Sequence, residues 1–249
     1  APKTPKPTTV TPEPTTVTPV PSTPAGERDI RTLKYTAFEL KYDCKHRTAL
    51  RWFYVMGKDV GSAKRPSSFY MDPNMPEGCL QQKSTKAYSR GYDRGHLVAS
   101  NHMDTDASII HESHYMNNIV PQVARFNQGI WAQTEVVQEC YRDIQPVTTY
   151  GGVIYTNDTS ADIFVDGWGI RTPTFFWKVV LTKDDKTGAD KIISWYFPNK
   201  EGLGKLDEYL VSVNYIESKL NDGLGPIPIS DALKSEVAPK TWDIPQNCD

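Results

Sequence analysis

The sequence predicts an α+β domain with a central antiparallel sheet flanked by helices, and two kinds of pattern predict it. Stretches rich in apolar, β-branched and aromatic residues indicate five strands, at residues 38–42, 49–56, 150–155, 175–182 and 192–197. Apolar positions at helical spacing indicate two helices, at residues 128–141 and 206–220. Strands grouped in the centre with only a few helices are typical of the α+β class.

The N-terminal region differs in composition from the rest of the chain. Residues 1–25 are almost entirely Pro, Thr, Val, Ser and Lys, and Thr-Thr-Val-Thr-Pro occurs at 8–12 and again at 15–19. Proline removes backbone donors and the stretch lacks apolar mass to pack. We therefore expect a disordered linker or stalk over residues 1–29, of the kind that carries O-linked glycans, and a globular domain over residues 30–249.

The first two strands are separated by a short polar segment, residues 43–48, which predicts a hairpin turn. The middle strands are apolar throughout, so we expect them to be buried on both faces. No stretch approaches the roughly 18–20 consecutive apolar residues that span a bilayer, so no membrane is expected among the partners. The oligomeric state is not indicated.

The four cysteines predict two disulfides rather than a zinc site, because they form an even set without a CxxC pair. Three pairings are possible, and proximity in sequence favours Cys44–Cys79 with Cys140–Cys248; free buried thiols are the alternative. Disulfides, a Thr/Pro-rich stalk and a chain that begins at Ala1 rather than Met suggest a processed, secreted, extracellular protein.

Charge is unevenly distributed along the chain. The net charge is −2, yet residues 41–94 contain eleven Lys/Arg and five Asp/Glu, so this span carries +6 and the rest carries −8. A local basic region beside an active site suits a phosphodiester substrate. An ordinary solvated surface is the alternative, and charge alone does not decide between them.

The most informative motif is Asp93-Arg94-Gly95-His96. Asn127 follows His96 by 31 positions, and Glu135 follows Asn127 by eight. Phosphodiester hydrolysis needs an activated water, neutralised charge on the phosphate and assistance to the leaving 3′-oxygen. A neutral imidazole can accept a proton from water near pH 7, so His96 is the candidate base. Gly95 permits a turn or a close approach that a side chain would block.

The run from Tyr92 to Leu97 resembles the active-site signature of the DNA/RNA non-specific endonucleases, which have the ββα-metal nuclease fold. The resemblance extends roughly over residues 35–225, with similar segments at 42–52, 173–178 and 197–199. It implies an endonuclease that hydrolyses DNA and RNA with one Mg²⁺ ion, for which Mn²⁺ is a possible substitute. It also implies products with 5′-phosphate and 3′-hydroxyl ends.

The resemblance implies that Asn127 is the metal ligand through its amide oxygen, a hard donor that suits magnesium. The alternative is a helix N-cap, since an apolar-periodic helix follows it. On a regular helix Glu135 would lie about 12 Å further along the axis and about 80° around it. That distance is long for a second ligand, so we expect Glu135 to hold water around the ion or an arginine; a surface carboxylate is the alternative.

Four further residues complete the candidate site. Arg94 is expected to contact phosphate, although a structural ion pair would also explain it, and Asp93 is expected to orient Arg94 or a neighbouring backbone amide. The resemblance places Arg65 as a second substrate-binding arginine. It gives Asn118 a supporting role in orienting the site.

Other features carry weaker signals. His111-Glu112-Ser113-His114 is one residue shorter than the HExxH zinc motif, so no metal is expected there. Asn157-Asp158-Thr159 is an N-glycosylation sequon, which is meaningful in a secretory context. Two alternatives to the enzyme remain: a binding or regulatory protein that keeps the nuclease fold without cleavage, and a structural surface glycoprotein. The presence of both His96 and Asn127 favours the enzyme, and metal-dependent cleavage distinguishes it from both alternatives.

Overall fold

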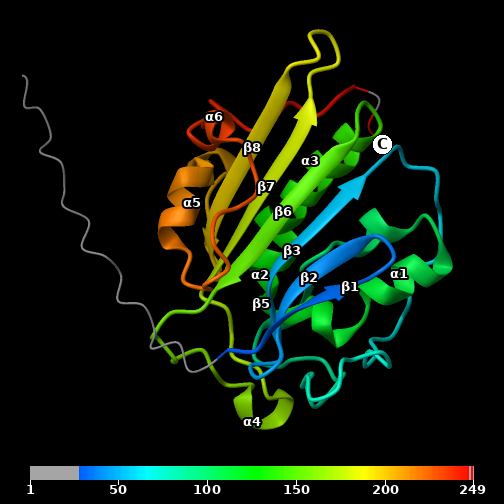
Figure 1. The fold of residues 1–249 in the computed structure, drawn as a ribbon, viewed down its shortest axis with the longest axis vertical. Helices are drawn as coiled ribbons and strands as arrows, with labels where there is room; N and C mark the ends of the chain where they lie inside the picture. The colour runs from blue at the N-terminus through cyan, green and yellow to red at the C-terminus, as the bar shows by residue number, and fades with distance from the viewer. Residues whose placement is uncertain (1–27, 247, 249) are drawn as a thin grey trace, which may run out of the picture.

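The computed structural model describes residues 28–246 and residue 248, and an antiparallel six-stranded sheet forms its centre (Figure 1). The strands follow the order β1-β2-β3-β6-β7-β8 across the sheet. Their bounds are Ile30–Lys34, Phe38–Asp43, Thr48–Met56, Val147–Ile154, Phe175–Lys183 and Asp190–Pro198. A separate antiparallel ribbon pairs β4, Tyr92–His96, with β5, Ile119–Val123.

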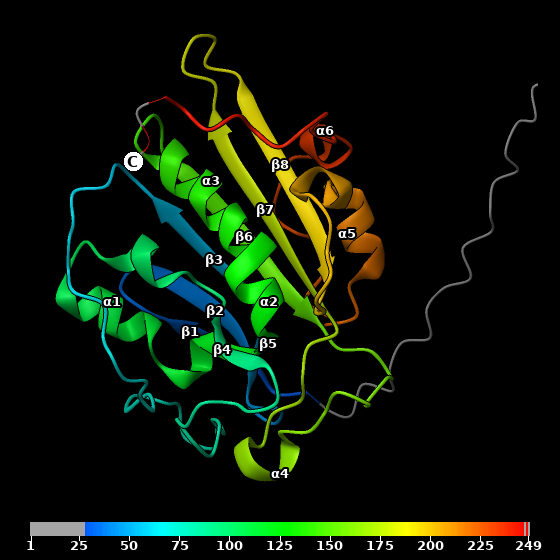
Figure 2. The same ribbon diagram turned by 180° about the vertical axis from the view of Figure 1, so that it is seen from behind.

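One face of the sheet is covered by the ribbon and by the helices that lie in front in Figure 2. These are α1, α2 and α3 at Ala107–Ser113, Ala124–Phe126 and Ala132–Arg142, with a π-helical turn, η3, at Asn127–Trp131. Short 3₁₀ turns, η1 and η2, occupy Ser100–Met103 and Met116–Asn118. The main core lies here, where Phe126 and Trp131 pack against Phe176 and Phe197 of the sheet.

The opposite face is covered over β7 and β8 by α5, Val213–Lys219, and α6, Asp231–Lys234 (Figure 1). The segment between these two helices reaches β3 and β6, where Arg51 donates to Asp222 and the Tyr150 hydroxyl donates to the Pro228 carbonyl. Val213 and Ile216 of α5 pack there with Trp177 and Val179, which form a second, smaller core. The helical turn α4, Val165–Trp168, lies in the connection from β6 to β7, and η4, Leu206–Tyr209, follows β8. Buried aliphatic and aromatic side chains on both faces of β7 explain its apolar sequence, which Lys178 interrupts.

All five predicted strands are present, and the turn between β2 and β3 lies at residues 44–47. The predicted α+β class with a central antiparallel sheet is confirmed. β1 was not predicted; it pairs with β2 in full register from Ile30–Asp43 to Lys34–Glu39. Its half-exposed, mixed sequence lacks an apolar pattern.

The prediction of one helix over residues 206–220 is wrong. The segment forms η4 and α5, separated by extended backbone at Leu210, with φ −66° and ψ 129°. There the Val211 N–H donates to the Ser194 carbonyl at 3.0 Å, and the Ser194 hydroxyl donates to the Val211 carbonyl. Pairing with β8 thus replaces a helical turn, a tertiary effect that apolar periodicity does not reveal.

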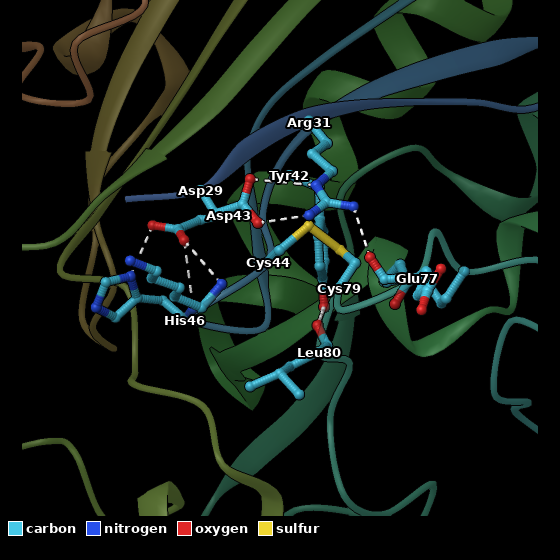
Figure 3. The surroundings of a disulfide bond; sticks show 12 residues. Asp29, Arg31, Tyr42, Asp43, Cys44, His46, Glu77, Cys79 and Leu80 are labelled. Atoms are coloured by element: carbon cyan, nitrogen blue, oxygen red, sulfur yellow. Dashed lines mark hydrogen bonds and ion pairs between the residues drawn. A yellow bond between two sulfur atoms is a disulfide. The ribbon is translucent and has the colours of Figure 1, made fainter. Parts of the chain in front are cut away.

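Both predicted disulfides, Cys44–Cys79 and Cys140–Cys248, are present. Figure 3 shows how the first fastens the long loop 57–91 to the β2–β3 hairpin. Beside it the Leu80 N–H donates to the Cys44 carbonyl at 3.0 Å, and the Tyr42 hydroxyl donates to the Leu80 carbonyl at 3.0 Å. The loop therefore has a fixed base although it contains no strand or helix of its own.

Within the described residues, no helix is long and apolar enough to cross a membrane. Most of the predicted stalk, residues 1–27, lies outside the described residues. The division at residues 29 and 30 therefore stays a prediction.

Candidate active site

The ribbon and the helix after it bring the motif residues together. β4 carries Asp93, Arg94, Gly95 and His96, and β5 lies antiparallel to it with His96 opposite Ile119. α2 begins directly after β5 and leads into η3, so Asn127 lies within one helical turn of the ribbon. This strand–strand–helix unit is the ββα arrangement that the sequence predicts.

His96 ends β4 with only 8% of its surface exposed. Its ring packs against Phe69 and His114, with centroid distances of 5.4 and 4.8 Å. Burial lowers the pKa of His96 well below its ordinary value, and the positive fields of His114, Arg65 and Arg94 lower it further. The imidazole is therefore neutral at pH 7 and can accept a proton.

Gly95 allows the two strands of the ribbon to pack closely. A β-carbon at Gly95 would overlap the side chain of Gln122, which is fully buried on β5. The expectation of a close approach at Gly95 is therefore met by a specific neighbour. A larger residue here would push apart the strands that carry His96.

Asn127 is oriented by Asp93. The Asn127 Nδ2 and the Gln128 Nε2 both donate to Asp93 Oδ2, each at 2.8 Å. The expectation that Asp93 orients Arg94 or a backbone amide is wrong, because its carboxylate is taken up by these two side-chain amides. With Nδ2 held, the Asn127 Oδ1 accepts no hydrogen bond from any described residue, and the side chain is half-buried.

The N-cap alternative for Asn127 is also wrong. Asn127 has helical backbone angles, φ −56° and ψ −54°, and the helix has already begun at Ala124. Its oxygen is instead a hard donor on a half-exposed surface, which fits a divalent cation such as Mg²⁺. No group of three or more His, Cys, Asp or Glu suited to a metal occurs in the described part of the chain, so an ion here would rely on Asn127, water and substrate.

Glu135 lies in the first turn of α3, but the helix that leads to it is not regular. Gly129 has φ −104° and ψ −110°, and the turn from Asn127 to Trp131 is π-helical. The angular offset expected from a regular helix therefore does not apply.

Glu135 is half-buried and lies in the fields of two cations. Burial raises its pKa, whereas Lys178 and Arg65 lower it. Lys178 is fully buried on β7, where its Nζ donates to Thr134 Oγ1 at 2.8 Å and lies 3.9 Å from the centroid of the Trp131 ring. Because the Glu135 side chain is half-buried, it is not a simple surface carboxylate, and its role at the ion stays a prediction.

The two predicted arginines lie on different elements. Arg94 lies on β4, where its Nη1 donates to the Thr85 carbonyl at 2.8 Å and its guanidinium stacks 3.9 Å from the centroid of the Phe69 ring. It forms no ion pair with any described residue, so the structural ion pair is not its role. Arg65 is exposed on the loop 57–91, and its charge acts on both His96 and Glu135.

Asn118 is fully buried, and all its side-chain hydrogen bonds go to backbone. Oδ1 accepts from the Val98 N–H at 2.9 Å, while Nδ2 donates to the carbonyls of Val98 at 2.9 Å and Ser113 at 2.8 Å. Asn118 therefore fastens the chain just after His96 to the end of α1.

Other sequence features fall outside this cluster. Asn157 is exposed in the loop after β6, so a glycan could be attached there, and its modification stays a prediction. Part of the basic span is structural, since Arg51 forms a buried ion pair with Asp222 at 2.6 Å. The His111 ring lies against Tyr70 and the His114 ring against His96, with centroid distances of 4.2 and 4.8 Å.

Sequence reasoning missed Phe69, His114 and Lys178. Phe69 comes from a loop, and only the folded chain shows that its ring touches His96 and Arg94. The lysine within an apolar run at 175–182 was the available signal for Lys178. For His114 the sequence offers only the His111–His114 spacing, which points to a zinc ligand and not to a partner of His96.

Comparison with known proteins agrees with this geometry. The model of a family described as DNA/RNA non-specific endonuclease matches residues 18–227. A mitochondrial nuclease EXOG of Danio rerio is 29% identical over 200 residues, which cover 74% of this chain and 57% of that protein. A mitochondrial endonuclease G of Caenorhabditis elegans is 26% identical over 215 residues, which cover 77% and 66%. The chain thus spans little more than half the length of the first of these relatives.

The fold is shared with a solved structure. A crystal structure of an EndoG/EndoGI complex aligns with a TM-score of 0.61 at 20% identity, over 78% of this chain and 86% of that one. The relatives also correct one prediction. The expectation of a secreted, extracellular protein is contradicted, because the similar proteins are named as mitochondrial nucleases.

Proposed function

Because the chain belongs to the DNA/RNA non-specific endonuclease family, we propose that it is an Mg²⁺-dependent endonuclease that hydrolyses DNA and RNA and leaves 5′-phosphate ends. The observation that carries the proposal is the placement of a neutral His96 and an oriented Asn127 on one ββα unit. Mn²⁺, which accepts the same oxygen donors, is expected to substitute for Mg²⁺.

In the proposed reaction His96 is the general base. It takes a proton from a water molecule, whose oxygen attacks phosphorus in line with the bond to the 3′-oxygen. The new P–O bond forms as the bond to the 3′-oxygen breaks, and the departing oxygen takes a proton from solvent. The low pKa of His96 makes it a weak base in the free protein, and an approaching phosphate raises that pKa because negative charge favours the imidazolium.

Asn127 would hold the divalent ion through Oδ1, with Asp93 fixing the amide. A bound ion supplies charge neutralisation on the phosphate and assists departure of the 3′-oxygen. Glu135 is proposed to order water at this position, and Asn118 to hold the backbone that follows His96.

Arg94 and Arg65 are proposed to bind the phosphate. The Arg94 guanidinium is anchored by Thr85 and Phe69 and forms no ion pair within the described chain, so its charge is available to an anion. Contacts of this kind read the backbone rather than the bases, so base identity should matter little. No step uses a 2′-hydroxyl, and both DNA and RNA are therefore expected substrates.

The test is digestion of supercoiled plasmid and total RNA in Mg²⁺, in Mn²⁺ and in EDTA. We expect both nucleic acids to be degraded with either ion and neither in EDTA. Mapping the ends with a 5′-phosphate-dependent exonuclease should show sensitive products. Intact substrates in both ions would refute the proposed function and favour a binding protein with the nuclease fold.

A further inference from the structure

A second buried histidine, His114, lies beside His96 and has no part in the proposed reaction. It follows α1 and is fully buried. Its backbone is held on both sides, because its N–H donates to the His111 carbonyl at 3.0 Å and its carbonyl accepts from the Tyr70 N–H at 3.1 Å. A fully enclosed imidazole in a fixed position requires an explanation.

The hydrogen bonds of His114 determine its tautomer. Nδ1 lies 3.0 Å from the Ile110 carbonyl oxygen, which can only accept, and 3.2 Å from the Ser113 hydroxyl, whose own hydrogen goes to the same carbonyl at 2.7 Å. Nδ1 therefore carries the hydrogen. In the neutral ring Nε2 then has a lone pair and can only accept. This Nε2 is buried and has no hydrogen-bond partner among the described residues.

His96 also has a ring nitrogen that lacks a hydrogen-bond partner. Its Nε2 is also buried without a partner in the described part of the molecule. The two rings are 4.8 Å apart between centroids and meet edge to face at 73°. The Phe69 ring lies against both imidazoles, with centroid distances of 5.4 Å to His96 and 5.2 Å to His114. The two nitrogens form no hydrogen bond as the rings lie, and rotation of an imidazole about its last torsion is soft, so the contact requires a turn of the His96 ring.

We propose that His114 is a positioning residue for His96: its Nε2 accepts a hydrogen bond from Nε2–H of His96. That bond fixes the His96 tautomer in which Nδ1 has the lone pair and can take the proton from water. His114 itself gains and loses no proton in the reaction. The inference rests on the proposed function, in which His96 is the base.

The surrounding structure holds this pair at constant separation. Asn118 bonds both carbonyl and N–H of Val98, two residues after His96, and also the Ser113 carbonyl, one residue before His114. Thus one buried amide connects the segments that carry the two rings. The backbone separation of the two histidines is thus fixed before substrate binds, which lowers the cost of ordering their rings.

The charges around His114 keep it an acceptor. The groups that face it are Arg65 from the loop 57–91, Arg94 and His96 from β4, and His111 from its own helix. Burial, Arg65, His111 and Arg94 lower the pKa of His114, and only its bond to the Ile110 carbonyl raises it. Its Nε2 therefore stays unprotonated at neutral pH.

Imidazole ¹⁵N chemical shifts in the whole protein test the proposal, because they report which ring nitrogen carries hydrogen. The His96 signals are identified by their loss in His96→Ala. We expect the parent to show His96 protonated at Nε2 and His114 at Nδ1. In His114→Phe, which fills the space without an acceptor, His96 should become a mixture of tautomers.

Cleavage kinetics provide a second readout. In His114→Phe the kcat should fall about tenfold, with KM for DNA unchanged, as expected when a partner that orients a functional histidine is removed. His114→Gln supplies a carbonyl oxygen and should recover part of the kcat. His46→Phe is the matched control, since His46 lies in the β2–β3 turn, where its Nδ1 is 2.7 Å from Asp43 Oδ2, and it should behave as the parent.

The proposal is overturned if the parent shows His96 protonated at Nδ1, or if His114→Phe keeps both the parent tautomer and the parent kcat. If His114→Phe does not fold, the His96 tautomers in the parent and in His114→Gln still decide whether the proposal holds. Failure of the proposed nuclease activity has a different signature, namely a parent that cleaves neither DNA nor RNA, and the tautomer of His96 remains measurable in that case.

Discussion

Asp93 Oδ2 accepts a hydrogen bond from Asn127 Nδ2 at 2.8 Å, so a carboxylate on β4 determines which atom of Asn127 faces outward. An amide that rotated by half a turn would present a donor, and a cation could not bind to it. The Asp of the Asp-Arg-Gly-His motif is thus connected to the predicted metal position, although 34 residues separate the two in sequence.

Asp93→Asn should therefore weaken the binding of Mg²⁺ rather than abolish cleavage. It replaces a charged acceptor by a neutral amide, and loss of such an orienting partner typically costs about 10–100-fold in metal affinity. The Mg²⁺ concentration at half-maximal cleavage should rise accordingly. Asp185→Asn, at an exposed carboxylate between β7 and β8, is the control. An unchanged Mg²⁺ dependence in Asp93→Asn would exclude the orienting role.

Gly95→Ala should destabilise the protein because its β-carbon would overlap Gln122 on the neighbouring strand. Overpacking of this kind costs about 1–3 kcal/mol in free energy of unfolding, which urea denaturation measures. Gly57→Ala has open space around its β-carbon and should be near neutral. Gly95→Ala should cost less in a Gln122→Gly background, which removes the overlapping Gln122 β-carbon together with its amide; an equal cost in both backgrounds would show that the overlap is not the cause.

The stability of the protein should depend on pH through two neighbouring groups, His102 and Glu139, whose effects on stability have opposite signs. Burial lowers the pKa of His102 from 6.5 to about 3, so between these values the unfolded chain binds more protons and acidification destabilises the fold. Burial raises the pKa of Glu139 from 4.5 to about 7, so between these values the folded state binds more protons and acidification stabilises it.

In the parent these two effects offset each other between pH 4.5 and 6.5, whereas His96 and His114 act in the same sense as His102. Glu139→Gln should steepen the loss of stability on acidification, by at most about 1.4 kcal/mol per pH unit. His102→Gln should make it shallower. Urea unfolding at pH 7, 6, 5 and 4 measures the slopes, and parallel curves for both variants and the parent would contradict the assignment.

The two disulfides should have different functional consequences. Cys44–Cys79 fastens the loop that carries Arg65 and Phe69, whereas Cys140–Cys248 ties the C-terminus to α3. Replacing either pair by serine should cost about 2–5 kcal/mol of stability. Only the first should also lower kcat/KM, by about 10–100-fold, because small misplacement of substrate-positioning groups is costly. Equal kcat/KM in the two variants would show that the loop does not depend on its anchor.

Much of the fold was predictable from the sequence because the buried strands appear in it as runs of apolar residues. β7 is largely apolar on both faces since α3 packs on one and α5 on the other, and that environment leaves an apolar run that only Lys178 interrupts between Phe175 and Leu181. β1 lacks such a run because it is an edge strand with half-exposed side chains. The helix predicted over residues 206–220 failed at Leu210, where pairing with β8 outweighs local propensity.

The candidate site was predictable as a set of residues but not as a set of contacts. Asp-Arg-Gly-His and the later asparagine are visible in the chain, whereas the hydrogen bond between Asp93 and Asn127 depends on the π-helical turn at Gly129. Likewise nothing local connects His114 with His96. Their contact arises because Asn118 joins β4 to α1 across the fold.

The most direct test of the account is the single-turnover cleavage rate of His96→Ala on a defined DNA duplex in saturating Mg²⁺, with and without added imidazole. If His96 takes the proton from water, the rate should fall about 10²–10⁴-fold, and imidazole should restore part of it by occupying the vacated space. A rate within about threefold of the parent, well below the contribution expected of a general base, would contradict the account.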